Sequence, residues 1–254
     1  MHRIPEILSR FEPISLDQAG SVKLMDRKDT KFVFRDELLP GILGKLQEDY
    51  LVLEAGPTRS PRYETDYFDT ADFHHFRQHH SKHLNRFKVR LRKYLDTGDA
   101  FFEIKKRNNH GNTVKKRIPV SQDETVINDR LREFLETNHC CRKQDTEPKL
   151  RIRFHRITLV GREQPERITL DFGLHYSNGK TEHACERLII GEVKQERLSR
   201  SSFERIMRAE GIRPYSISKY CLGIATLYGH IRHNLVKPKI RYINKLTHDP
   251  HRHS

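Results

Sequence analysis

The residues whose types and spacing most clearly suggest chemistry are cations at alternate positions of one segment, 86–94. Its even positions hold Arg86, Lys88, Arg90 and Arg92, and its odd positions hold Phe87, Val89 and Leu91. A strand places alternate side chains on opposite faces, so the four cations share one face. Like charges on one face repel one another unless water or an anion lies between them. This segment therefore raises the question of which anion it holds.

The segment 101–107 and the overall charge extend this pattern. Glu103, Lys105 and Arg107 share one face of a second short strand. The whole chain has 48 Lys and Arg against 34 Asp and Glu, a formal net charge of +14. Such a balance favours polyanionic partners, namely nucleic acid, polyphosphate, nucleotides or anionic lipid.

Length and composition indicate a water-soluble globular protein. The 254 residues suffice for one large domain or two small ones, and thirteen Phe and nine Tyr can build a core. Cysteines 140, 141, 185 and 221 lack the paired spacing of a zinc site, which favours reduced thiols. No apolar leader and no apolar run of ~20 residues is present. We expect a cytoplasmic protein that a membrane partner could hold at the inner face of a membrane.

The elements that must position the cations are predicted from periodicity and turn residues. Strands alternate with turns rather than with helices in most of the chain, which favours an antiparallel sheet of α+β class. The predicted strands are 23–34, 63–68, 86–94, 100–107, 113–120, 149–160, 167–172 and 185–194. The predicted helices are 4–8, 37–48, a short one through Phe73 and Phe76, 123–140, 201–210 and 218–230.

Several of these strands carry cations beside apolar neighbours. For any single strand, a solvated outer face is the simpler interpretation. Several such strands together favour an eight-stranded antiparallel β-barrel with flanking helices and a charged lumen. We divide the chain into an N-terminal leader, 1–21, a tunnel domain, 22–235, and a basic tail, 236–254, that is expected to be loose.

Five short motifs occur in an order that resembles a known family. They are Arg27-Lys28-Asp29-Thr30-Lys31-Phe32, Tyr67-Phe68-Asp69-Thr70, Lys88-Val89-Arg90-Leu91-Arg92-Lys93-Tyr94, Glu103-Ile104-Lys105 and Ser218-Lys219-Tyr220. The ordered set resembles the VTC domain, the polyphosphate polymerase module of the vacuolar transporter chaperone, over about residues 22–230. That family belongs to the triphosphate tunnel metalloenzymes of the CYTH-like superfamily, whose fold is an eight-stranded barrel.

The resemblance implies roles for individual residues. Glu192, in Gly191-Glu192-Val193-Lys194, matches the family's metal-binding glutamate and implies Mn²⁺ or Mg²⁺ as cofactor. The matching catalytic cations are Lys31, Arg90, Arg92, Lys105 and Arg156. The predicted substrate-binding cations are Lys88, Lys115, Arg117, Arg167, Lys194 and Lys219. Arg86 and Lys93 are interpreted as rim or surface charge.

Alternation and resemblance disagree at one of these residues. Arg156 shares parity with Leu150, Ile152 and Phe154, so alternation does not place it with Arg151 and Arg153. Glu192 has the alternative of pairing with Lys194 or a tunnel arginine, and Lys219 that of an ordinary helix-surface lysine.

The implied activity is transfer of the γ-phosphoryl group of ATP onto a growing inorganic polyphosphate chain. A tunnel triphosphatase is the alternative enzyme, but hydrolases of this superfamily often begin with Glu-x-Glu-x-Lys, and Arg27, Asp29 and Lys31 stand there instead. The alternatives outside enzymes are a non-catalytic module that binds polyphosphate or another polyanion, and a nucleic-acid-binding protein that uses the same net charge. The expected partners are ATP and polyphosphate, with no specific nucleic acid and with a membrane protein as a further candidate.

Overall fold

The computed structural model describes residues 3–21, 27–140, 146–196 and 201–248. One sheet dominates it, and eight of its strands follow one path in which every neighbouring pair is antiparallel. In path order they are β2 (Arg27–Arg35), β11 (Leu188–Glu196), β9 (Glu166–Ser177), β8 (Thr146–Gly161), β4 (Arg62–Thr70), β5 (Arg86–Tyr94), β6 (Ala100–Arg107) and β7 (Thr113–Pro119). These are the eight predicted strands, and the predicted fold class is confirmed.

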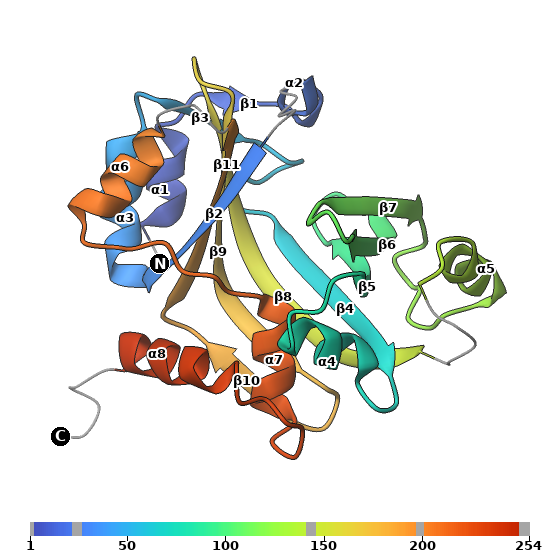
Figure 1. The fold of residues 1–254 in the computed structure, drawn as a ribbon. Helices are drawn as coiled ribbons and strands as arrows, with labels where there is room; N and C mark the ends of the chain where they lie inside the picture. Colours follow the sequence, from blue (N-terminus) through green and yellow to red (C-terminus); the bar gives the residue numbers. More distant parts are fainter. Residues whose placement is uncertain (1–2, 22–26, 141–145, 197–200, 249–254) are drawn as a thin grey trace.

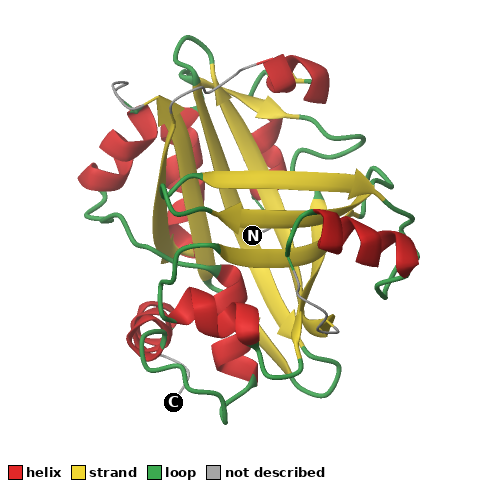
Figure 2. Cartoon of the chain, turned by 45° about the vertical axis from the view of Figure 1, so that its right-hand side comes forward, coloured by secondary structure: helices red, strands yellow, loops and turns green. Residues whose placement is uncertain are grey.

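The sheet curls so that its two ends approach each other. Figure 2 shows β5, β6 and β7 running across the front of the longer strands. Lys31 of β2 and Lys105 of β6 lie close enough for the charge of Lys31 to lower the pKa of Lys105. Within the described residues β2 and β7 do not pair, so the barrel is curled but not hydrogen-bonded shut.

Three short strands extend this path and were not predicted. β1 (Pro13–Ile14) pairs in parallel with β3 (Tyr50–Leu53), and β3 pairs with β8. β10 (Glu182–Cys185) pairs with β9.

Helices cover the outer, convex face of the sheet in two places. α1 (Ile4–Ser9), α3 (Leu39–Leu46) and α6 (Ser202–Ala209) lie on the outer side of β2, β11 and β9 (Figure 1). Phe32, Phe34 and Leu170 pack there, because the even positions of β2 and β9 face outward at this level. α5 (Asp129–Thr137) covers β5 and β6 over Val89 and Leu91. The cations of β5 therefore point to the concave side.

The concave side is partly filled by helices. α7 (Lys219–Leu227) packs on the inner apolar residues Leu150, Ile152 and Tyr176, and α4 (His74–His80) packs beside it against β4 and β5. A Cβ on Gly223 of α7 would lie 2.7 Å from side-chain carbons of Leu150 and Tyr176, so only glycine permits this approach. One end of the lumen is thus an apolar core, and the other end is polar.

Two structural expectations need correction. Residues 237–247 of the expected loose tail form α8 (Lys237–Thr247), which packs through the buried Ile243. The helix predicted over 123–140 begins only after Asn128, whose side chain accepts a hydrogen bond from the Leu131 N–H.

Residues 23–26 and 249–254 lie outside the described residues. The remaining short elements are α2 (Leu16–Ser21) and the 3₁₀ turn Asp36–Leu38. No helix in the described ranges is long and apolar enough to cross a bilayer.

Candidate anion-binding tunnel

The polar end of the lumen collects side chains from seven strands and from the start of α7. Cations outnumber carboxylates among the described residues that face it. The carboxylates are Asp29, Glu103, Asp171 and Glu192. The cations are Lys31, Lys88, Arg90, Arg92, Lys105, Lys115, Arg156, Lys194 and Lys219, all of them predicted site residues.

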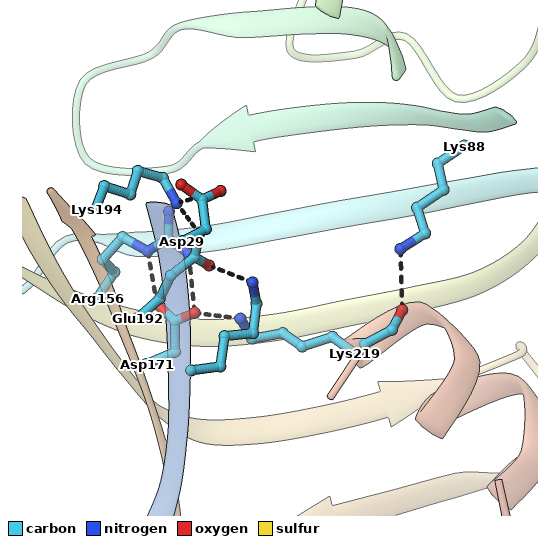
Figure 3. A network of polar contacts seen from close by, with 9 residues as sticks. Asp29, Lys88, Arg156, Asp171, Glu192, Lys194 and Lys219 are labelled. Atoms are coloured by element: carbon cyan, nitrogen blue, oxygen red, sulfur yellow. Dashed lines mark hydrogen bonds and ion pairs between the residues drawn. The ribbon is translucent and has the colours of Figure 1, made fainter. Parts of the chain in front are cut away.

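Asp171 of β9 holds two of these cations. It is 2% exposed, and it accepts hydrogen bonds from Arg156 Nε at 2.6 Å and Arg156 Nη2 at 2.8 Å. Lys219 Nζ at the start of α7 also donates to Asp171 (Figure 3). Burial alone would raise the pKa of Asp171, but the two cations hold it well below its usual range. Burial lowers the pKa of Lys219 to about 8 despite this partner.

Glu192 and Asp29 form a second group at the seam between β2 and β11. The register sets Lys31 opposite Glu192 and Asp29 opposite Lys194. Lys31 Nζ lies 3.3 Å from Glu192 Oε2, and Lys194 Nζ contacts Glu192 and lies 3.5 Å from Asp29 Oδ2. Burial lowers the pKa of Lys194 to about 7. In Figure 3 this group lies beside the Asp171 group.

Glu103 of β6 is the third carboxylate centre. It is 1% exposed and accepts from Arg90 Nε at 2.6 Å, while Lys115 of β7 contacts its other oxygen. Burial would raise the pKa of Glu103, but Arg90, Arg92 and Lys115 lower it to about 2. The carboxylate is therefore ionised at any physiological pH and neutralises part of the basic strand.

Three lumen cations have no carboxylate partner in the described part of the chain. Lys88 donates to Ser218 Oγ at 3.0 Å, and Arg92 Nε donates to Thr65 Oγ1 at 3.3 Å. Lys105 makes no hydrogen bond or ion pair there. Desolvation by the tunnel walls, together with nearby Lys88 and Arg90, lowers the pKa of Lys105 to about 8. These cations lie on β5 and β6 and are free to bind an anionic ligand.

Several lumen cations lie over the faces of aromatic rings. Arg92 and Arg156 both lie over the ring of Tyr63, at 5.8 and 5.2 Å from its centroid. The Tyr63 ring stacks in turn on Phe154, over which Lys219 lies at 4.9 Å. A cation is attracted to a ring face without being neutralised. For Arg92, which has no carboxylate partner in the described part of the chain, the ring therefore positions charge that remains available to a ligand.

The position of Arg156 resolves the conflict between alternation and resemblance. Leu150, Ile152, Phe154 and Arg156 all face inward, the first three under α7 and the last in the polar lumen. Arg151 and Arg153 face outward instead, where they pair with Asp66 and Glu64. Alternation was correct about which residues share a face, but on β8 the apolar face is the inner one.

Two predicted residues lie at the rim. Arg117 of β7 is exposed and lies over the Phe101 ring at 4.3 Å. Arg167 donates from Nη2 to the carbonyl oxygen of Ala19 in α2. Neither belongs to the central groups.

A cavity of about 620 Å³ opens at the end of the lumen near α4 and α8. Lys88 and Lys105 are shared between this cavity and the lumen, and Arg86 and Arg107 lie further out. No carboxylate contributes to its lining among the described residues. The positive surface thus continues from the lumen to this mouth.

Comparison with known proteins agrees with this geometry. Residues 26–228 match the family model described as VTC domain. The chain belongs to the VTC domain family. A search of curated proteins finds no significant match.

Solved structures also resemble this VTC domain. One is a candidate adenylate cyclase from Bacillus halodurans, with a TM-score of 0.51, 14% identity, and coverage of 80% of this chain and 100% of that chain. Another is HpAC1 from Hippeastrum, described as a candidate adenylyl cyclase with dominant triphosphatase activity, with a TM-score of 0.48, 14% identity, and coverage of 83% and 99%. At such identity the first likeness shows the fold alone, which is the triphosphate tunnel fold. Family and site together support a triphosphate tunnel enzyme.

The donor set of this VTC domain fits a divalent metal only in part. No three or more His, Cys, Asp or Glu gather into a metal site in the described ranges. Glu192 and Asp29 are nevertheless close enough to share Lys194. Mg²⁺ is commonly held by one or two carboxylates together with substrate phosphates and water. The residues therefore suit an ion that is bound jointly with a phosphate chain.

Sequence reasoning missed three residues of the VTC domain site. Asp171 and Tyr63 were not assigned roles, and Ser218 was quoted only as part of a motif. Asp171 is an even number of residues from Arg167, a predicted site residue, so alternation along β9 would have placed both on the same face. Lys93, interpreted as rim or surface charge, is only 7% exposed and lies opposite Glu64.

Proposed function

We propose that this protein is a metal-dependent polyphosphate polymerase. It transfers the γ-phosphoryl group of ATP onto the end of an inorganic polyphosphate chain held in the cationic tunnel. Membership of the VTC domain family supports this proposal. The single observation that carries it is the line of lumen cations, Lys88, Arg92 and Lys105, that lack a carboxylate partner among the described residues.

This arrangement suits phosphoryl transfer because that reaction depends on positioning and charge neutralisation. Arg92 offers planar donors that match phosphate oxygens and remains charged when desolvated. Arg90 and Arg156 are held by Glu103 and Asp171, which fixes their guanidinium groups at the lumen wall. A repeating anion lying along β5 would meet several fixed cations in turn.

The metal would be held by Glu192 with Asp29. When bound, a divalent ion neutralises phosphate charge and orients the transferred group. Lys31 and Lys194 occupy these carboxylates in the free protein. When the metal ion binds the two carboxylates, the ammonium groups of Lys31 and Lys194 can pair with the phosphate chain instead. No charge in the group is then left without a partner.

Incubation with ATP and Mn²⁺, followed by a gel stained for polyphosphate, tests the proposal. Chain growth is expected. Arg92→Ala should reduce it by about 100-fold, the usual loss for one preorganised charge donor. The matched control is Arg153→Ala, which removes an arginine from the outer face and should leave synthesis unchanged.

Three other outcomes would replace the proposal. Release of phosphate without chains indicates a tunnel triphosphatase. Binding of polyphosphate without turnover indicates a polyanion-binding module. Tight binding of duplex DNA that survives Arg90→Ala indicates a ligand outside the tunnel.

A further inference from the structure

The hydroxyl group of Tyr67 lies among the lumen cations without an assigned role. Tyr67 is 6% exposed and stands opposite Arg90 in the register of β4 and β5. Its ring stacks on Tyr220 of α7 at a centroid distance of 4.9 Å, which fixes the direction of the hydroxyl. Arg90 Nη1 donates to Tyr67 Oη at 3.4 Å.

The Tyr67 hydroxyl has an unused proton. A phenol both accepts and donates, and here only the acceptor side is used. In the part of the chain that the structure describes, the Tyr67 O–H donates to no acceptor. Its charged neighbours, Arg90, Arg92 and Lys88, are all donors. A buried donor without an acceptor is unfavourable, and an anionic ligand in the lumen would supply the acceptor.

The electrostatic setting agrees with a missing anion. Burial would raise the pKa of Tyr67, but Arg90, Arg92 and Lys88 lower it to about 8. An anion bound among these cations would reverse that effect. Tyr63, on the same face of β4, differs: burial raises its pKa even though Arg156 and Arg92 lie against its ring.

We propose that Tyr67 is a further substrate-contacting residue, whose hydroxyl donates a hydrogen bond to a non-bridging oxygen of a phosphate chain held by Arg90 and Lys88. This inference rests on the proposed function only for the class of ligand, an inorganic triphosphate or longer chain. It does not require that the protein synthesises polymer.

Titration of inorganic triphosphate into the protein, without ATP, tests the contact. Tyr67→Phe keeps the ring stack on Tyr220 and removes only the oxygen. We expect its Kd for triphosphate to rise about tenfold or more, as for a lost hydrogen bond to a charged group. Tyr176→Phe is the matched control, because it removes a buried hydroxyl from the apolar core under α7 and should leave the Kd unchanged.

A second measurement uses the wild-type protein alone. Near-ultraviolet absorbance should show one tyrosine ionising near pH 8, consistent with the lowered pKa of about 8 for Tyr67. Saturating triphosphate should move that ionisation to higher pH, a change that a purely structural tyrosine would not show. Tyr67→Phe should lack this transition.

The inference is overturned if triphosphate binds while the tyrosine ionisation stays in place, or if Tyr67→Phe binds triphosphate as tightly as wild type. It is also overturned if triphosphate does not bind at all. Triphosphate binding that shifts the tyrosine, with no polymer made from ATP, would leave this inference standing and refute the polymerase. If Tyr67→Phe binds triphosphate and makes polyphosphate as well as wild type does, the role of Tyr67 is refuted and the polymerase proposal stands.

Discussion

Replacing Asp171 by Asn should lower the stability of the ligand-free protein and increase the stabilisation that a bound polyanion provides. Asp171 is the buried partner of both Arg156 and Lys219. The amide has the same shape but no charge, so two cations lose their counter-charge. A phosphate chain in the lumen can supply that charge again.

The magnitude follows from which cation can lose its proton. Breaking a buried ion pair by removing one partner typically costs about 3–5 kcal/mol. Lys219, whose pKa is about 8, can deprotonate at neutral pH at a cost of about 1.4 kcal/mol or less. Arg156 cannot deprotonate, so its charge stays uncompensated. We therefore expect the lower end, about 3 kcal/mol, which corresponds to a Tm lowered by roughly 6–12 °C.

Thermal unfolding with and without inorganic triphosphate measures both effects. Triphosphate should restore about 1.5 kcal/mol or more in Asp171→Asn beyond its effect on wild type. That difference corresponds to roughly 3–6 °C of additional stabilisation. Asp66→Asn is the matched control, because Asp66 pairs with Arg151 on the outer face. It should lose stability but gain no more from triphosphate than wild type does.

Equal triphosphate shifts in wild type and Asp171→Asn would refute this reasoning. Arg156 and Lys219 would then not face the ligand. A variant that loses no stability would show instead that the two cations are already hydrated.

Other substitutions probe the remaining groups of the tunnel. Affinity for triphosphate should fall as pH rises above about 8, because Lys105 has a lowered pKa of about 8 and binds anions only when protonated. Lys105→Arg should make that fall less steep in calorimetric titrations, and an unchanged slope would exclude Lys105 from the binding site. Glu192→Ala should abolish Mn²⁺-dependent turnover while nearly preserving polyphosphate binding in a filter assay; persistent turnover would show that the metal is held elsewhere. Tyr63→Leu should weaken triphosphate binding several-fold, because the ring under Arg92 and Arg156 is worth about 1 kcal/mol. Tyr63→Phe should bind like wild type, and equal loss in both variants would implicate the hydroxyl instead.

Alternation predicted the basic wall correctly because β5 is regular. Arg90 and Arg92 face the lumen and Val89 and Leu91 face α5, as a period of two requires. The same reasoning could not say which face of β8 is inner, because its inner face is apolar where α7 covers it and polar at Arg156. That distinction depends on where α7 packs, which is a long-range property.

β9 shows a second limit of periodicity. Asp171 faces inward at an odd position, and Leu174 and Tyr176 face inward at even positions. Gly173, with a φ of 61°, separates them, and the register with β8 shifts there. A bulge of this kind reverses the parity of a strand. A single glycine among apolar residues gave little warning of it.

The rings under the cations of the lumen and its rim have a consequence for how ions exchange. A lysine or arginine bound to a carboxylate must give up one anion before it accepts another, so substrate binding there is a substitution. Lys88, Arg92 and Arg117 lie over Tyr220, Tyr63 and Phe101 and have no carboxylate partner among the described residues. They exchange only mobile ions from solution. The dependence of affinity on salt should therefore reflect the number of cations without a carboxylate partner rather than the total charge of the tunnel.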